Sequence, residues 1–150
     1  MKNNFLIFII IYIICGYNLA FSDSYTFETK KIEIIDEGKT IKALNGKAFS
    51  KDNNLEISSD NFEYFRDLDL LKSKNGQAFI KSKKLNIKYN SAIFNQKNLT
   101  FNAEGDVSIF KNDKDLIINT NKVTFDGKKN VISSNSVTEI KDNLNNTNNY

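Results

Sequence analysis

The sequence predicts an all-β protein built from stacked repeats of about 30 residues. An apolar motif returns at a nearly constant interval, a glycine column follows the same interval, and no segment beyond residue 22 has helical periodicity. A single unit of this length cannot bury its own apolar face, so neighbouring units must share one continuous interior. We therefore expect a folded-over sheet or an open-ended jelly-roll-like stack, whose end strands remain free to pair with another chain.

The repeated motif is clearest in residues 55–64 (LEISSDNFEY) and returns at residues 85–94, 116–125 and, more distantly, 25–34. A column of glycines at positions 46, 76 and 105 follows the same interval. This spacing indicates that equivalent side chains of successive units stack on one another. In register, the apolar columns are Tyr25/Leu55/Leu85/Leu116, Phe27/Ile57/Ile87/Ile118, Ile32/Phe62/Ala92/Val123 and Ile34/Tyr64/Phe94/Phe125.

Within each unit, apolar and polar residues alternate, which is typical of strands with one buried face. Leu55 and Ile57 form the first alternating pair, and Phe62 and Tyr64 form the second. The five steps from Ile57 to Phe62 would place these side chains on opposite faces of a straight strand. We therefore expect two strands separated by a corner or bulge at residues 58–61, where Asp and Asn tolerate unusual backbone angles.

The glycines and turn sequences predict where the units begin and end. Gly46, Gly76 and Gly105 are each expected to start a strand, at a tight turn or at a close approach of two backbones. Residues 36–39 (DEGK) and 125–128 (FDGK) have the composition of hairpin turns.

Both ends of the chain differ in composition from the repeats. Residues 1–22 contain one early lysine, an apolar run, and small residues before a cleavage site between Ser22 and Asp23, which together predict a secretory signal peptide. A retained inner-membrane anchor is the alternative. Residues 141–150 are polar and predict a disordered tail, which leaves residues 23–140 as the domain.

The composition excludes most kinds of catalytic site. The 150 residues include no histidine, no tryptophan and a single cysteine, Cys15, which lies within the predicted signal peptide. A Ser-His-Asp triad, a Cys-His pair and the usual zinc sites are therefore excluded. Charges of both signs are interspersed, with a formal net charge of +3, which does not favour nucleic acid as a partner. We expect no enzyme activity, no catalytic residue, no metal and no cofactor.

The motif resembles that of the OstA-like family of lipopolysaccharide-transport proteins, which includes the bridge protein LptA and the N-terminal periplasmic domain of the translocon LptD. The shared pattern is Leu-x-Ile-x-(Ala/Ser)-Asp-x-(Phe/Val)-x-Tyr, best matched by residues 55–64, with unit starts at residues 76–78 (GQA) and 105–107 (GDV). The resemblance covers about residues 25–140. Two copies depart from the pattern, because Tyr89-Asn90 replaces Ser-Asp and the first copy lacks the Asp.

The resemblance implies a periplasmic β-jelly-roll whose apolar interior shields the acyl chains of lipopolysaccharide. It implies lipopolysaccharide as the ligand, and other jelly-roll domains of the transport bridge as partners through head-to-tail strand pairing. Self-association is a further expectation. The side chains expected to line the interior are Phe27, Ile32, Ile34, Leu55, Ile57, Phe62, Tyr64, Leu85, Ile87, Phe94, Leu116, Ile118, Val123 and Phe125.

The residues alone leave alternatives open. The apolar columns could form a closed, dry core instead of a lipid-accepting one. A structural filament or adhesin subunit built from β-repeats would form long homopolymers and bind no lipid. A module for another lipid, such as a phospholipid, would bind without depending on the lipopolysaccharide headgroup. The chain could also be either a complete bridge protein or a part of a translocon.

Overall fold

The computed structural model describes residues 23–52, 54–111, 116–141 and 147–149. They form one antiparallel sheet of ten strands, which confirms the prediction of an all-β fold. The long strands are β1 (Tyr25–Ile35), β2 (Thr40–Ser50), β3 (Leu55–Phe65), β4 (Leu70–Ile80), β5 (Leu85–Asn95), β6 (Thr100–Lys111) and β7 (Leu116–Asp126). The short elements are β8 (Val131–Ser133), β9 (Thr138–Lys141), β10 (Thr147–Asn149) and the 3-10 turns η1 (Asp36–Gly38) and η2 (Lys81–Lys83).

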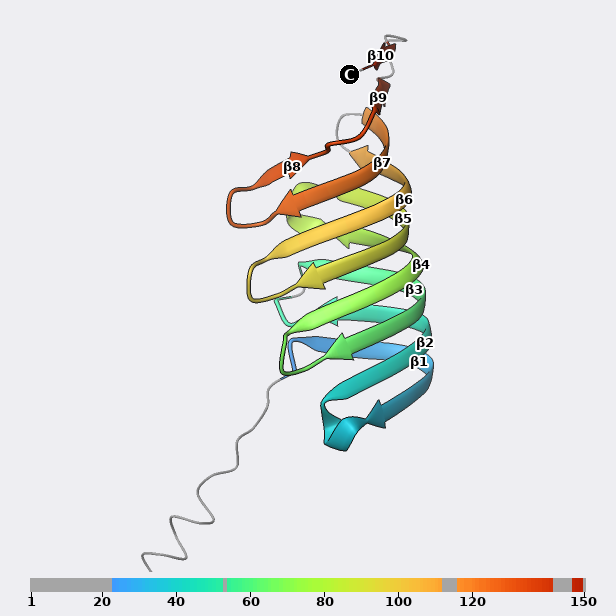
Figure 1. Ribbon diagram of the computed structural model, residues 1–150, viewed down its shortest axis with the longest axis vertical. Helices are drawn as coiled ribbons and strands as arrows, with labels where there is room; N and C mark the ends of the chain where they lie inside the picture. The colour runs from blue at the N-terminus through green and yellow to red at the C-terminus, as the bar shows by residue number, and fades with distance from the viewer. Residues whose placement is uncertain (1–22, 53, 112–115, 142–146, 150) are drawn as a thin grey trace, which may run out of the picture.

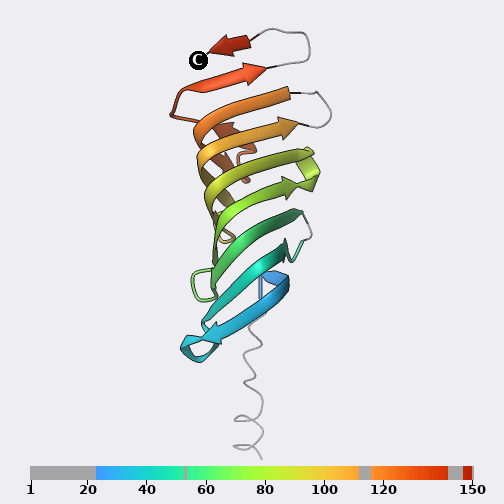
Figure 2. The same ribbon diagram turned by 90° about the vertical axis from the view of Figure 1, so that its right-hand side faces the viewer.

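The sheet folds over along a line through the middle of its long strands, so that its two halves face each other as walls (Figure 1). The first wall contains the first halves of β1, β3, β5 and β7, and the second wall contains their second halves. The strands are stacked in chain order along the long axis of the molecule (Figure 2). We call the fold line the corner, and the gap between the free rims of the two walls the mouth.

In the odd-numbered strands, the alternation of inward-facing and outward-facing residues shifts at the corner. Leu55, Ile57 and Ser59 of β3 are buried, the next two residues are exposed, and Phe62 and Tyr64 are buried again. The two exposed neighbours shift the alternation by one step, which brings both apolar pairs to the same side. The predicted corner is therefore confirmed, but β3 continues through it as one strand and not as two.

In the even-numbered strands, the corner contains a residue with a positive φ angle: Asn45 (50°), Asn75 (51°) or Asp106 (47°). Asn and Asp adopt this left-handed conformation more readily than most residues with a side chain. The adjacent glycine has no room for a side chain, because a Cβ on Gly76 would lie 2.5 Å from the carbonyl oxygen of Ser58. The predicted close approach is confirmed, but the glycines lie in the middle of strands and not at their starts.

Hydroxyl groups stabilise the corner in three odd-numbered strands. Thr29, Ser59 and Thr120 occupy equivalent positions, and each side-chain oxygen lies 3.1–3.5 Å from the carbonyl oxygen two residues later. The hydroxyls of Thr29 and Ser59 also donate to a carbonyl oxygen of the neighbouring strand. Because an unpaired carbonyl near the protein interior costs free energy, these bonds favour the bent strand.

In the interior, several large side chains of the odd-numbered strands pack beside small side chains of the even-numbered ones. Phe62 pairs with Ala43, and Ile57 lies between Ala48 and Ala78 on its two neighbouring strands. The three alanines have no exposed surface. This pairing of large with small residues lets the two walls approach each other at normal packing density.

At the β1 end of the stack, two side chains on the inner face of the sheet are exposed to solvent. Ile32 and Ile34 of β1 pair with the buried residues Ala43 and Ile41 of β2, so they share the inner face. Ile32 is nevertheless 49% exposed and Ile34 59% exposed. Their predicted role in lining a lipid-accepting interior stays a prediction, but the two side chains are not enclosed by the sheet. The reason is that β1 has β2 as its one strand neighbour within the described sheet.

At the other end, the last bent strand is split in two. β8 pairs with the second half of β7, and β9 pairs with the first half. β10 pairs with β9, so residues 147–149 form a strand inside the segment that was expected to be a disordered tail. Lys141, the first residue of that segment, ends β9. The predicted signal peptide, residues 1–22, and residues 142–146 and 150 of the tail lie outside the described residues.

We expect Gly76→Ala to lower the free energy of unfolding by about 1–3 kcal/mol, because the new methyl group overlaps the backbone of β3. Urea denaturation of the purified protein measures this change. The control is Asn75→Gly at the neighbouring position, where glycine accepts the positive φ angle. A change within about 0.5 kcal/mol is expected there. Equal effects of the two substitutions would contradict the close approach at Gly76.

Candidate functional site

The mouth is bordered by the turns that connect the strands. Residues 51, 52, 54 and 81–84 form the described rim of the first wall, and residues 66–69, 96–99 and 127–130 form the rim of the second wall. Backbone hydrogen bonds join successive turns along each rim. The amide of Lys81 donates to the carbonyl of Asn54 (2.9 Å), and the amide of Gln96 donates to the carbonyl of Asp69 (3.0 Å). The two rims are therefore continuous ridges.

Near β1, an ion pair joins the two rims and closes the mouth. Arg66 on the second wall lies 2.7 Å through Nε from Asp23 Oδ1 and donates through Nη2 to Asp23 Oδ2 (2.8 Å). The same guanidinium donates through Nη1 to the carbonyl of Gly38 (2.6 Å). Both charged side chains are partly buried, and the bond from Nη2 is a charge-assisted hydrogen bond, which is the stronger kind. Nε has no hydrogen-bond partner among the described residues. We call the contacts of Asp23 and Ser24 with Arg66 and Tyr64 the clasp.

Tyr64 completes the clasp from the second wall. Its hydroxyl accepts a hydrogen bond from the amide of Ser24 (3.3 Å) and donates to Asp69 Oδ1 (2.8 Å). Below these bonds, the ring of Tyr25 lies edge-on to Tyr64, with centroids 5.2 Å apart, and edge-on to Phe94 at 5.9 Å. Aromatic rings thus fill the space between the walls, and the interior beneath the clasp is solidly packed.

Beyond the clasp, a cavity of about 280 Å³ opens between the rims. Its apolar surface comes from Phe94, Phe101 and Phe125 together with Leu55 and Ile80. Its outer border consists of polar turn residues of both walls. An apolar floor with a polar border is the usual character of a site for a small amphiphilic molecule.

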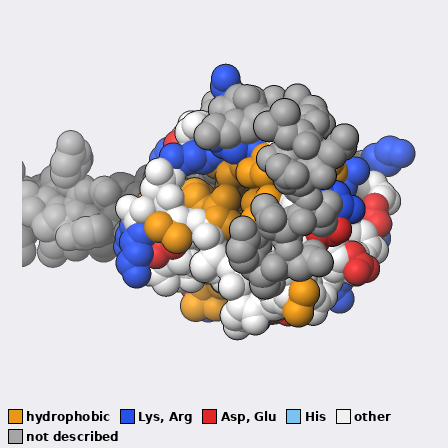
Figure 3. Space-filling view, turned by 90° about the horizontal axis from the view of Figure 1, so that it is seen from above, with side chains coloured by type: hydrophobic (Ala, Val, Ile, Leu, Met, Phe, Trp, Pro, Cys, Tyr) orange, Lys and Arg blue, Asp and Glu red, His pale blue; other side chains and the backbone are white. Residues whose placement is uncertain are grey.

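A second cavity of about 230 Å³ continues in the direction of the C-terminal end. Its lining is almost entirely apolar, and it shares Lys83, Phe125 and Asn130 with the first cavity. The view onto this end shows apolar side chains at the centre and several basic side chains around them (Figure 3). The interior is thus accessible in the part of the mouth away from β1. We call the two cavities together the cleft.

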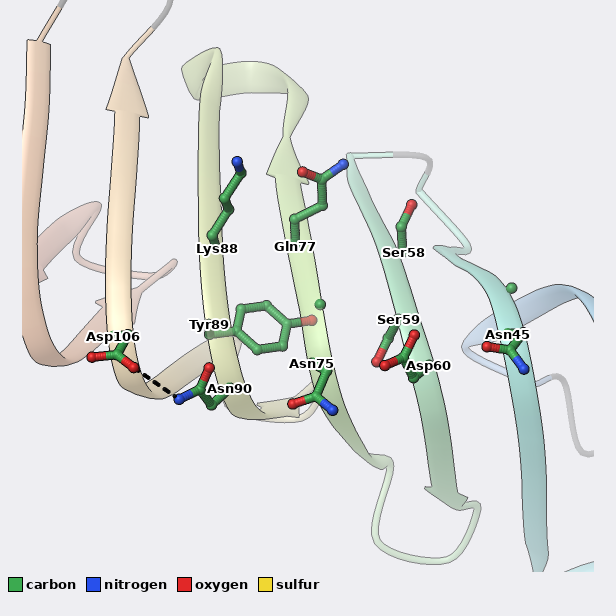
Figure 4. A pocket seen from close by; sticks show the side chains of 12 residues that line it. Asn45, Ser58, Ser59, Asp60, Asn75, Gln77, Lys88, Tyr89, Asn90 and Asp106 are labelled. Carbon is green, nitrogen blue, oxygen red and sulfur yellow. Dashed lines mark hydrogen bonds between the residues drawn. The ribbon is translucent and has the colours of Figure 1, made fainter.

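A third depression, of about 580 Å³, lies along the corner and has a different character (Figure 4). It is a wide, shallow, polar groove over the side-chain-free positions Gly46 and Gly76. The amide of Asn90 donates to Asp106 in it (3.3 Å), and the hydroxyl of Tyr89 bonds to Ser73 (2.8 Å). These four side chains are hydrogen-bonded to one another in pairs, and the groove lies where two glycines leave space at the corner. We therefore assign it no ligand.

Burial raises the pKa of three interior tyrosines above the ordinary value of 10.0. It is the main cause for Tyr25 and Tyr89, and for Tyr64 the hydrogen bond to Asp69 adds to it. Hydrogen bonds from Ser24 partly oppose the shift of Tyr64. The phenols of Tyr25 and Tyr89 therefore stay neutral in the folded protein well above the pH at which an exposed tyrosine ionises, and the pKa of Tyr64 is shifted in the same direction.

Most of the side chains expected to line the interior are buried. Phe27, Leu116 and Ile118 are partly buried, while Ile32 and Ile34 are exposed on β1. Leu55, Phe94 and Phe125 line the first cavity, and Leu85, Leu116, Ile118 and again Phe125 line the second. The buried members are Leu55, Ile57, Phe62, Tyr64, Leu85, Ile87, Phe94, Val123 and Phe125.

Sequence reasoning missed the buried columns of the even-numbered strands and the polar groups of the mouth. The buried columns Ile41/Leu71/Phe101 and Ala48/Ala78/Val107 recur at the same interval of about 30 residues, so the repeat could have revealed them. The pairing of Asp23 with Arg66 has no such signal. It depends on which turns face each other across the mouth.

The fold is shared with LptH, described as the LptA-homologous periplasmic component of the conserved lipopolysaccharide transport device from Pseudomonas aeruginosa. The two structures have a TM-score of 0.64 at 6% sequence identity, over 75% of this chain and 85% of that chain. No family model matches the sequence. No curated protein matches it either. The likeness therefore shows an LptA-like β-jelly-roll fold, and a function has to be argued from the site.

We expect stability to fall as the pH rises above 10, because the buried tyrosines resist ionisation only in the folded state. Above that pH the unfolded chain loses phenolic protons that the folded protein keeps, so unfolding becomes easier. Below pH 10 both states hold these protons, and the contribution is constant. Urea denaturation at several pH values measures the slope.

The control variant for this measurement is Tyr89→Phe, which removes one raised pKa and keeps the ring. Its stability should fall less steeply with pH than that of the unmodified protein. Parallel pH profiles would show that ionisation of Tyr89 does not contribute.

Proposed function

We propose that this protein is a periplasmic lipopolysaccharide-transport domain that shields acyl chains in its interior and leaves the headgroup in water. The observation that carries the proposal is the cleft, which opens an apolar interior between the rims. An acyl chain of about a dozen carbons resists transfer into water by roughly 10 kcal/mol, at about 0.8 kcal/mol per methylene. Carrying it across an aqueous compartment therefore requires an apolar path of this kind.

The cleft favours a lipid-accepting interior over a closed, dry core. Phe94, Phe101 and Phe125 line it although they belong to the buried core, so the space between the rims reaches the core itself. An empty apolar cavity costs stability, since its lining atoms lack contact partners. A bound acyl chain would supply those contacts. The proposed function requires no bond to be made or broken, so we assign no catalytic residue.

The open ends of the stack support the proposal of head-to-tail joining. Ile32 and Ile34 present apolar surface beside the edge of β1 that no described strand covers, and Val137 does so at the other end of the stack. A free edge strand with apolar neighbours is suited to strand addition by another jelly-roll domain or by a second copy of this chain. Joined in this way, the interiors of successive domains would form a longer apolar path.

The periplasmic location rests on the predicted cleavage between Ser22 and Asp23. The part of the chain that the structure describes contains no helix that could span a membrane. The fold is also that of a periplasmic transport component. A retained inner-membrane anchor formed by residues 1–22 is the alternative location.

We expect a photoreactive amino acid at position 94 to form an adduct with lipopolysaccharide in living cells. Phe94 is buried in the interior and lines the first cavity, so its replacement lies within reach of a bound acyl chain. Adducts are detected as lipopolysaccharide-positive bands after irradiation. The control position is Ile93, which neighbours Phe94 on β5 and is exposed on the outer face.

An adduct at position 94 and none at position 93 supports the proposal. An adduct with phospholipid alone would assign the interior to another lipid. If the folded protein forms no lipid adduct at position 94, the interior is a dry core and the transport function is contradicted.

A further inference from the structure

The balance of charge differs between the two halves of the mouth. Around the clasp there are five carboxylates and four cations. The carboxylates are Asp23, Asp36, Glu37, Asp67 and Asp69, and the cations are Lys39, Lys51, Arg66 and Lys97. Around the cleft, cations outnumber carboxylates among the described residues. The basic residues nearest to it are Lys81, Lys83, Lys84, Lys111, Lys128 and Lys129.

The carboxylates near the cleft are engaged within their own turns. Asp52 accepts hydrogen bonds from the hydroxyl of Ser50 and from the amide of Asn54 (3.1 Å). Asp126 accepts from the amides of Lys128 and Lys129, at 3.0 Å each, and these bonds help to hold its pKa below the ordinary value. Asp126 also lies 3.7 Å from Nζ of Lys129, so its charge is shared within its own turn. The lysines of residues 81–84 then remain as the positive charge on the first wall beside the cleft.

Lys83 occupies the junction of the two cavities. It lines both of them, is partly buried, and forms no ion pair with another residue in the described part of the chain. A lysine in such a position packs its methylene groups on apolar surface and keeps the ammonium group at the edge. Asn130, on the facing rim, also lines both cavities and can donate through its amide. Two potential hydrogen-bond donors thus face each other above one apolar cleft.

From these observations we infer that the cleft is a binding site for an anionic amphiphile. The acyl chain lies in the two cavities, and the anionic group is held at the mouth between Lys83 and Asn130. The clasp and the acidic turns beside it exclude the same group from the other half of the mouth, by packing and by repulsion. The inference deepens the proposed function and rests on it, because it assigns the headgroup of the carried lipid to one side of the mouth.

Two fluorescent probes of equal chain length test this inference: dansyl-labelled undecanoic acid, which is anionic at neutral pH, and its uncharged methyl ester. Binding to the purified protein is measured from the increase in dansyl fluorescence. We expect the acid to bind more tightly than the ester, and its advantage to shrink at high salt. Lys83→Gln should weaken binding of the acid by about two- to fivefold and leave the ester unchanged.

Two matched variants serve as controls. Lys39→Gln removes the same charge beside the clasp and should leave both probes unchanged. Ile132→Asn, which alters the lining of the second cavity, should weaken both probes by about five- to tenfold. Val131→Asn changes the neighbouring exposed residue, which is not part of the lining, and should leave both unchanged.

The outcomes separate the two proposals. If both probes bind equally well, or if Lys83→Gln and Lys39→Gln have the same effect, the anionic site is overturned while an apolar carrier interior stands. If neither probe binds to the folded protein, the carrier function and the anionic site both fail.

Discussion

The rest of the structure depends on one constraint: each long strand has to bend at the same level while its apolar side chains remain inside. Side chains alternate with a period of two, so a bend must also shift the alternation. The odd-numbered strands achieve this with two exposed neighbours at the corner, and the even-numbered strands with a left-handed residue beside a glycine. Because each bend packs against the next, a failure at Gly76 would affect both walls.

The bend places the turns of the two walls opposite each other, and what these turns contain decides where the interior is accessible. Beside β1, Asp23 and Arg66 hold the rims together above a layer of aromatic rings. Beyond that point no equivalent pair joins the rims within the described residues, and the apolar lining reaches the surface at the cleft. The same fold thus forms a closed half and an open half from nearly identical repeats.

The repeat made the fold class and most of the interior predictable, because columns such as Ile57/Ile87 and Phe62/Val123 follow directly from a fixed interval. Ile32 and Ile34 match those columns equally well, yet they are exposed. The pattern identifies the face of a strand and carries no information on whether another strand covers it. The clasp was not predictable either, since Asp23 and Arg66 are 43 positions apart and meet only after the sheet folds over.

The account predicts an interior that is closed at the clasp and open at the cleft. Its most direct test is the distance across the mouth, measured between pairs of spin labels by pulsed electron paramagnetic resonance. The pair Lys81→Cys and Lys128→Cys spans the cleft, and the pair Thr26→Cys and Asp67→Cys spans the clasp, in a chain carrying Cys15→Ser. On addition of purified lipopolysaccharide, the distance across the cleft should change and the distance across the clasp should stay constant. Unchanged distances in both pairs, or equal changes in both, would contradict the account.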